Sequence, residues 1–172
     1  MSIILNVGIK RLDQSLKLSK KMEHQEFWNT FLENQKLPKD TSYFEAFHFH
    51  FEENWANELL RLVLIGQKKA TASSYYAFDK QGLSLPKVGD YSIVTDFANH
   101  PKCIIQTKNI RMIPFKDMTY DICKLEGEDD SLESWREGHI RFFSHEANTL
   151  GYVFSEDMPV VFEEFEVVYQ VD

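Results

Sequence analysis

Cysteine is scarce in this sequence, which holds only Cys103 and Cys123 among its 172 residues. Two cysteines are too few for the disulfide framework of a small secreted domain, and they do not form the CxxC spacing of a zinc site. No apolar run approaches the roughly 20 residues that span a bilayer. Lys10 and Arg11 follow the short apolar patch at 3–5, and no signal-peptide cleavage site follows it. We therefore expect a cytoplasmic protein with neither a secretion signal nor a membrane anchor.

Positive charge is also in deficit. The chain has 19 Lys and Arg against 27 Asp and Glu, which gives a formal net charge of -8. An averaged field of this sign repels a polyanion and disfavours non-specific binding to long nucleic acid. A nucleic-acid ligand would require a local basic patch, or a molecule as small as one nucleoside, which carries little or no phosphate charge.

Several common catalytic signatures are missing. The sequence has no P-loop, no GxGxxG motif and no Ser-His-Asp elbow. His48 and His50 alternate with the phenylalanines of residues 47–51, which predicts a half-buried strand whose polar face carries both imidazoles. Two imidazoles are too few for a metal site, and no further ligand stands at a recognisable spacing. We therefore expect no metal and no cofactor.

Large apolar side chains, by contrast, are plentiful. Hydrophobic residues make up 43% of the chain, with 14 Phe, 7 Tyr and 3 Trp among them. A chain of this length is expected to fold as one domain that buries roughly 70% of its unfolded surface. Residues 1–22 differ from the rest because they contain no aromatic residue and have weak periodicity. We therefore expect an N-terminal extension over 1–22 and a single domain over 23–172.

Helices and strands alternate along the domain. Helical spacing predicts an amphipathic helix over 23–35 and a second helix that begins at the N-cap Asn54, carries Trp55 on the same face as Leu59, Leu62 and Val63, and stops at Gly66. Ser131 is expected to cap a third long helix. The other expected elements are the strand 47–51, a hairpin of 91–96 with 102–112, a short helix with its connection within 114–125, and a closing strand 160–171.

The segment GQKKATASS, residues 66–74, is the first candidate for chemistry. Gly66 permits a tight turn, Lys68 offers a cation or an amine base, and Thr71 offers a nucleophilic hydroxyl. The same residues have a structural interpretation, because Lys68 and Lys69 suit the negative end of the preceding helix and Thr71 suits the start of a strand. On spacing alone both interpretations stay open.

The acidic loop EGEDD, residues 126–130, is the second candidate. Such a charge run is commonly a solvated loop, yet one carboxylate near a lysine and a hydroxyl would complete a catalytic set. His139 follows on the apolar face of the next helix. That position favours a hydrogen-bonded histidine of the core or the edge of a cleft over a general base.

Four stretches together carry a resemblance to a known family. They are ANELLRLVLIGQKKATASS, LPKVGDYSIVTDFANHPKCIIQT, LEGEDDSLESWREGHIRFF and FEEFEVVY. In order and spacing they resemble the ASCH domain family over about Phe47 to Tyr169. The resemblance implies an α+β fold, a PUA-like small mixed β-barrel flanked by helices, with a cleft in which the GxKxxT segment lies.

Members of this family have been linked to RNA binding, to ribonuclease activity and, in a compact bacterial branch, to removal of the acetyl group from N4-acetylcytidine. In that branch a Lys, a Thr and a Glu act together. Lys68 and Thr71 match this pair by position, whereas Glu126 and Glu128 both remain candidates for the Glu because the loop here is longer. Lys68 is either a base or a cation that stabilises an oxyanion.

The resemblance therefore implies a nucleoside or RNA as the partner, bound by an amidohydrolase, an RNA-binding module or a ribonuclease. We expect Lys68, Thr71 and at least one of Glu126 and Glu128 to converge on one concave site as catalytic residues. The candidates for substrate binding are Lys69, Ser73, Tyr75, Asp96, Ser131, Arg136 and His139. The candidates for a basic patch that binds an RNA strand are Lys108, Arg111 and Lys116.

Overall fold

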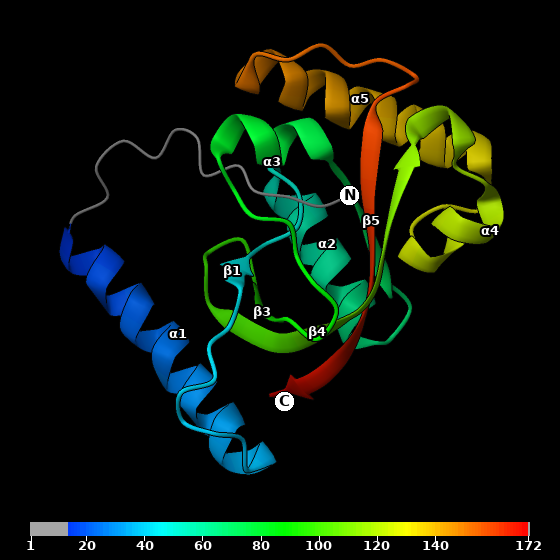
Figure 1. Cartoon of the computed structure of the whole chain (residues 1–172). Helices are drawn as coiled ribbons and strands as arrows, with labels where there is room; N and C mark the ends of the chain where they lie inside the picture. Colours follow the sequence, from blue (N-terminus) through cyan, green and yellow to red (C-terminus); the bar gives the residue numbers. More distant parts are fainter. Residues whose placement is uncertain (1–13, 172) are drawn as a thin grey trace.

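A mixed sheet of five strands curls into a half-barrel with helices packed on both faces. The computed structural model describes residues 14–171. The elements in chain order are α1 (Gln14–Gln35), β1 (Glu45–Phe47), α2 (Glu53–Leu64), β2 (Ala70–Ser74), α3 (Tyr75–Gln81), β3 (Tyr91–Thr95), β4 (Pro101–Pro114), the 3-10 turn η1 (Phe115–Asp117), α4 (Tyr120–Cys123), the 3-10 turn η2 (Lys124–Glu126), α5 (Leu132–Leu150) and β5 (Pro159–Gln170). This arrangement confirms the predicted α+β class with a mixed barrel-like sheet flanked by helices, and the sheet closes only as far as a half-barrel (Figure 1).

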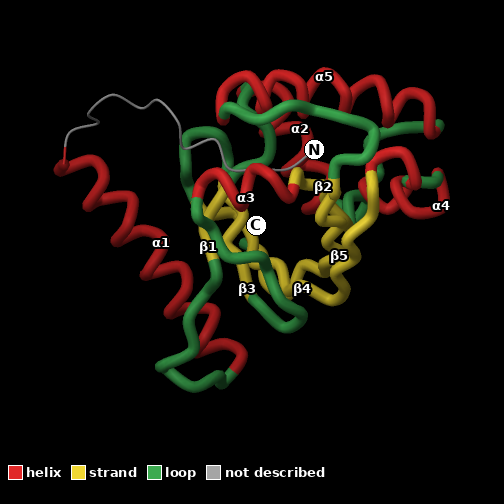
Figure 2. The backbone as a smooth tube through the Cα atoms, turned by 45° about the horizontal axis from the view of Figure 1, so that its top comes forward, coloured by secondary structure: helices red, strands yellow, loops and turns green. Residues whose placement is uncertain are grey.

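The two longest strands, β4 and β5, form the centre of the sheet. The strand order is β1-β3-β4-β5-β2, in which β1 pairs parallel with β3 and the other pairs are antiparallel. The β4–β5 register shifts between Ile104 and Ile105 and again between Thr107 and Asn109. Such irregularities increase local twist. The strands accordingly run round an open ring in Figure 2.

Both faces of the sheet are apolar, and each is covered by helices. Phe165, Val167 and Phe47 pack with Leu59 and Val63 of α2 on the face that we call the inner face. On the outer face, α5 packs over β2 and the first half of β5, and α1 packs over β3 and β4. Alternation along a strand then assigns each polar residue of the sheet to one of these two faces.

The predicted strand 47–51 is wrong in its extent. β1 covers only Glu45–Phe47, and bends follow it. His50 has a φ of 57°, so its backbone lies in the left-handed region and cannot continue a strand. The two imidazoles do not share a solvated face, because His50 is buried and its Nδ1 accepts a hydrogen bond from the Glu52 backbone N–H.

The predicted start of the second helix is also wrong. α2 begins at Glu53, with Glu52 as an N-cap that makes no side-chain capping bond, so Asn54 is already inside the helix. Trp55 is half exposed, and Ala56 takes the buried position instead. The buried face of α2 thus begins at Ala56 and not at Trp55.

The remaining elements agree with the prediction in part. Ser131 caps α5, since its Oγ accepts a hydrogen bond from the Ser134 backbone N–H at 3.1 Å. The hairpin β3–β4 and the closing strand β5 are confirmed. The helix α1 begins at Gln14, before the expected 23, while residues 1–13 of the predicted extension lie outside the described part of the chain. The helix α3 was not foreseen.

Candidate functional site

The GxKxxT segment leaves α2 through a turn that Gly66 permits. Gly66 has a φ of 74°, and the backbone N–H groups of Gln67 and Lys68 both donate to the Leu62 carbonyl oxygen, at 2.9 and 3.0 Å. These bonds satisfy the carbonyl end of the helix. The chain then enters β2, which pairs with β5. Lys68 is therefore held between the end of a helix and the start of a strand.

Backbone contacts bring the acidic loop against this segment. The Lys69 N–H donates to the Leu125 carbonyl oxygen at 2.8 Å, and the Gln67 side-chain amide donates to the Gly127 carbonyl oxygen at 2.7 Å. Gly127 has a φ of 71°, and a Cβ placed there would lie 2.5 Å from the Gln67 backbone oxygen. Only glycine allows this approach. The close contact places the glutamates on either side of Gly127 near Lys68.

Lys68 forms a buried ion pair with Glu128. The lysine is only 1% exposed, and its ammonium also lies 5.3 Å from the centre of the Phe49 ring. Burial would lower the pKa of Lys68, but the carboxylates of Glu128 and Glu126 outweigh it and raise that pKa above its usual range. Burial would likewise raise the pKa of Glu128, and the ammonium holds it below its usual range. Both groups are therefore charged at neutral pH.

Glu126 is the second buried carboxylate of this cluster and ends η2, against the first turns of α5. Trp135 Nε1 donates to its Oε2 at 3.3 Å, and His139 Nε2 lies 3.2 Å from the same oxygen. His139 Nδ1 in turn donates to the Trp135 carbonyl oxygen at 2.9 Å, and the two rings stack with centroids 4.0 Å apart. Burial opposes ionisation of Glu126, yet Lys68 and His139 are among the groups that lower its pKa. Both glutamates of the acidic loop therefore belong to the buried cluster around Lys68.

Thr71 lies on the inner face of β2. It is 1% exposed, and its hydroxyl has no hydrogen-bond partner among the residues that the structure describes. Its Cα partner across the strand pair is Glu163 of β5. Because opposed residues of an antiparallel pair point to the same side, the Thr71 and Glu163 side chains share the face that α2 covers.

The predicted substrate-binding residues are spread over the molecule. Ser73 is buried on β2, two residues beyond Thr71, whereas Lys69 is exposed and Tyr75 opens α3 at 36% exposure. Asp96 contacts His100 and Lys102 in the β3–β4 turn. In α5, Ser131 is the N-cap, Arg136 pairs with Glu156 and lies over the Phe115 ring, and His139 belongs to the buried cluster. Only Ser73 and His139 of this set lie in or next to the cluster, and the binding roles stay predictions.

The predicted basic patch has acidic partners. Lys108 pairs with Glu166, Arg111 pairs with Glu164 at 2.7 Å, and Lys116 pairs with Asp157 at 2.6 Å. These cations lie on β4 and η1, and their partners lie on or next to β5. Their charge toward a ligand is largely compensated. The patch also stays a prediction.

Two half-buried acids escaped the sequence prediction. Glu45 of β1 and Glu163 of β5 both lie on the inner face, and Thr107 Oγ1 donates to Glu163 Oε1 at 2.5 Å. Burial, together with the Glu163 carboxylate, raises the pKa of Glu45 to about 7. The available signal was the position of Glu163 in the pattern VFEEFEV, where it shares the apolar phase of Phe165 and Val167.

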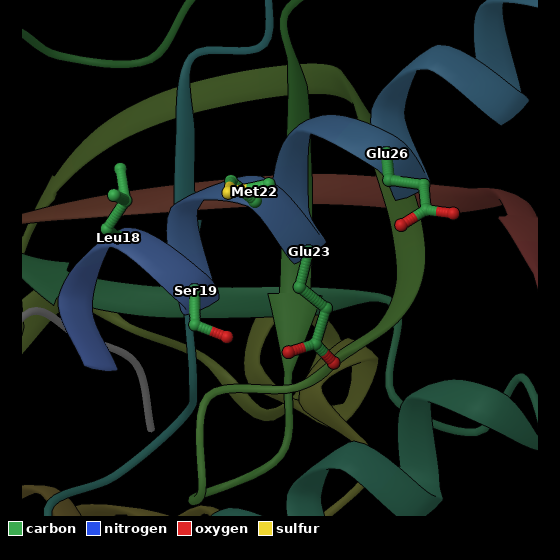
Figure 3. Close-up of a pocket in the computed structure, with 5 residues that line it drawn as sticks. All are labelled: Leu18, Ser19, Met22, Glu23 and Glu26. Carbon is green, nitrogen blue, oxygen red and sulfur yellow. The ribbon is translucent and has the colours of Figure 1, made fainter. Parts of the chain in front are cut away.

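A surface hollow on α1 contains none of the predicted site residues. Leu18, Ser19, Met22, Glu23 and Glu26 line it (Figure 3). Within residues 14–171, no helix is long and apolar enough to cross a membrane, and no group of three or more His, Cys, Asp or Glu side chains is arranged to hold a metal ion.

Comparison with known proteins identifies the family. Residues 45–169 match the ASCH domain. The structure is similar to that of an ASCH domain from Lactobacillus crispatus JV V101, with a TM-score of 0.78, 34% identity, and coverage of 87% of this chain and 96% of that one. It is also similar to a protein of Enterococcus faecalis V583, with a TM-score of 0.77, 31% identity, and coverage of 86% and 93%. A comparison with curated proteins found no match. The chain therefore belongs to the ASCH domain family, and its half-barrel has the PUA-like α+β fold expected of that family.

Proposed function

We propose that the protein is an amidohydrolase that removes the acyl group from an N4-acylated cytidine, with Lys68, Thr71 and Glu128 as the reacting set. The observation that carries the proposal is a buried ion pair between Lys68 and Glu128. Thr71 follows Lys68 by three residues, and its buried hydroxyl has no hydrogen-bond partner among the described residues. Burying ions and an unpaired hydroxyl costs stability. Buried polar groups that are present although they destabilise the fold are favoured candidates for catalytic residues.

Lys68 acts as a cation in this proposal. Its pKa is raised by the neighbouring glutamates, so the amine keeps its proton at neutral pH and is a poor general base. An ammonium already oriented in a buried site stabilises the negative charge that develops on the acyl oxygen. This assignment chooses between the two roles that the sequence left open for Lys68.

Thr71 supplies the nucleophile. Its Oγ attacks the acyl carbon while a carboxylate of the cluster takes the hydroxyl proton, and that proton passes to the ring amine as the C–N bond breaks. Water then hydrolyses the acyl-threonine ester, which releases the carboxylic acid and restores the hydroxyl. Glu128 is the preferred carrier because it pairs directly with Lys68, the cation that stabilises the acyl oxygen in this proposal.

Charge supports a nucleoside over an RNA strand. The net charge is -8, and Lys108, Arg111 and Lys116 each pair with an acidic side chain. A strand of RNA requires unpaired cations for its phosphates, whereas a nucleoside requires none. The alternatives of an RNA-binding module or a ribonuclease are outcomes of the same test.

The test measures turnover of N4-acetylcytidine and affinity for cytidine in Thr71→Ala, Thr71→Ser and Lys68→Ala. If Thr71 is the nucleophile, Thr71→Ala lowers turnover by about a thousandfold and leaves cytidine affinity within about twofold, because the lost interaction belongs to the transition state. Thr71→Ser retains part of the rate. Thr149→Ala is the matched control, since Thr149 is exposed at the end of α5.

Lys68→Ala needs a stability measurement beside the assay, because it leaves Glu128 buried without its cation and destabilises the fold by about 3–5 kcal/mol. Adding Glu128→Gln removes the uncompensated charge and restores part of that loss. A wild-type protein that leaves N4-acetylcytidine intact across neutral pH, while it binds or cleaves RNA, would contradict the proposal.

A further inference from the structure

Glu163 faces the proposed nucleophile from the neighbouring strand. It is the Cα partner of Thr71 and shares the inner face with Phe165, which packs against α2. Its Oε1 accepts a hydrogen bond from Thr107 on the other neighbouring strand, β4. The carboxyl group is thus held in place from the β4 side. On the β2 side, its strand partner Thr71 has a hydroxyl that makes no hydrogen bond to any residue of 14–171.

Glu45 approaches the same region from the opposite edge of the sheet. It alternates with Ala46, so it shares the inner face with Phe47, which packs with Val94 and α2. β1 and β5 are not neighbours in the strand order, whose strands run round the open ring of Figure 2, yet the Glu163 carboxylate is one of the causes that raise the pKa of Glu45. Neither Glu45 nor Glu163 forms an ion pair with a Lys or Arg within residues 14–171.

Both carboxyl groups keep contact with solvent although protein surrounds them. Each is only partly exposed, whereas Thr71, the strand partner of Glu163, is buried. Burial raises the pKa of Glu163, and the nearby Asp90 carboxylate adds to this effect, while the Thr107 hydrogen bond opposes it. The region therefore disfavours added negative charge but offers oxygen acceptors to a neutral group.

We infer that Glu163, with Glu45 beside it, forms the specificity-determining wall of the Thr71 site and accepts hydrogen bonds from the hydroxyl groups of an uncharged nucleoside. A carboxyl group offers acceptor oxygens whether or not it is ionised, so both side chains suit ribose hydroxyls. A phosphate brought to this wall would meet the carboxyl groups of Glu45 and Glu163, which no Lys or Arg of residues 14–171 neutralises through an ion pair. The wall therefore rejects nucleotides, and this specificity rests on the proposed function.

The test compares the dissociation constants of cytidine and cytidine 5′-monophosphate by calorimetry in the wild type, Glu163→Gln and Glu45→Gln. The wild type should bind cytidine at least about tenfold more tightly than the monophosphate. Glu163→Gln should weaken cytidine binding severalfold, as expected for the loss of a charge-assisted hydrogen bond, and should bring the two constants closer together. In the assay with N4-acetylcytidine, KM should rise while kcat stays within about threefold.

Glu166→Gln is the matched control. Glu166 lies on the same strand but is exposed and pairs with Lys108, so the same change of charge should leave both dissociation constants unaltered. Glutamine has the shape of the protonated acid, so both inner variants should fold, as thermal unfolding will show. If cytidine binds and the acylated nucleoside is hydrolysed, but Glu163→Gln and Glu45→Gln keep the wild-type ratio of constants, this inference alone is overturned. A wild type that binds neither molecule overturns the proposed substrate as well.

Discussion

Lys68 is compensated by more than one acid. Its ammonium pairs with Glu128, and the Glu126 carboxylate also raises its pKa. Glu126 is held in turn by Trp135 and His139. A buried ion pair is often no more stable than apolar replacements, but removing one member of a network leaves the others uncompensated. The cluster is therefore sensitive to single substitutions and defines one arrangement of its side chains.

The sequence was informative about which residues carry chemistry and less so about their contacts. The GxKxxT pattern and the acidic loop marked both halves of the cluster through the family resemblance. The pairing of Lys68 with Glu128 could not be read from spacing, because 60 residues separate the two. Glu45 was missed because a lone acid near a short strand has no pattern of its own.

Glu146 gives a prediction about pH that is independent of the site. This residue of α5 is 1% exposed, and Tyr152 donates a hydrogen bond to it at 2.6 Å. Burial raises the pKa of Glu146 from 4.5 to about 7, with the Tyr152 bond opposing the change. The folded protein therefore binds the proton more tightly than the unfolded chain, and the resulting stability is present below pH 4.5 and lost as pH rises through about 7.

Replacing Glu146 by Gln should remove this dependence. Between pH 5 and pH 8 the free energy of unfolding of the wild type should fall by about 2 kcal/mol more than that of Glu146→Gln, as measured by urea denaturation. Glu137→Gln, an exposed position on the same helix, is the control and should keep the wild-type pH profile. Parallel profiles for the wild type and Glu146→Gln would contradict the assignment.

At the scale of elements, regular apolar periodicity predicted helices and strands correctly, whereas a local bend of the backbone could not be predicted from the sequence. The apolar spacing of α5 and the β-rich composition of β5 gave both elements with the correct type. The alternation of Phe and His over 47–51 failed because tertiary contacts bend the chain at His50, whose φ is 57°. A period of two over five residues is too short to distinguish a strand from a compact turn packed against aromatic rings.

Gly127 is the element-scale feature on which the cluster depends. Gly127→Ala places a Cβ 2.5 Å from the Gln67 backbone oxygen at a φ of 71°. The loop must move away from Lys69 and Gln67, so we expect a loss of about 3 kcal/mol in the free energy of unfolding and loss of activity. Chemical denaturation with the N4-acetylcytidine assay measures both.

Gly82→Ala is the matched control for this substitution. Gly82 ends α3 with a φ of 63°, but a Cβ there meets nothing within 4 Å. The variant should lose only about 1 kcal/mol, the ordinary penalty of a left-handed alanine, and should keep the site intact. Equal losses for the two glycines would show that the approach of the loop to Gln67 does not matter.

At the scale of the whole molecule, the surface combines net negative charge with local pairing of its cations. Several lysines and arginines have an acidic neighbour within ion-pair distance, namely Arg61, Lys102, Lys108, Arg111, Lys116, Lys124 and Arg136. Individually such exposed pairs contribute little to stability. Together they reduce the positive potential that an RNA strand would need.

This charge distribution predicts weak interaction with RNA. Fluorescence anisotropy with a labelled single-stranded RNA should give a dissociation constant weaker than about 100 μM at physiological salt, because few counterions are released on binding. Lys108→Gln and Arg111→Gln should change it by less than about twofold. Tight binding that falls a hundredfold or more between about 50 and 200 mM salt would instead establish the basic patch as an RNA site.

The pairing of β2 with β5 has a consequence for the order in which the protein is built. β2 (Ala70–Ser74) carries Thr71, whereas its partner β5 (Pro159–Gln170) comes much later in the sequence. During translation the hydroxyl and the Lys68 ammonium emerge from the ribosome long before Glu128 and β5 do. Both groups stay hydrated until these distant segments arrive, so the loss of their water belongs to a late step of folding. A nascent chain that stops short of β5 carries every residue of the proposed reacting set and has no site.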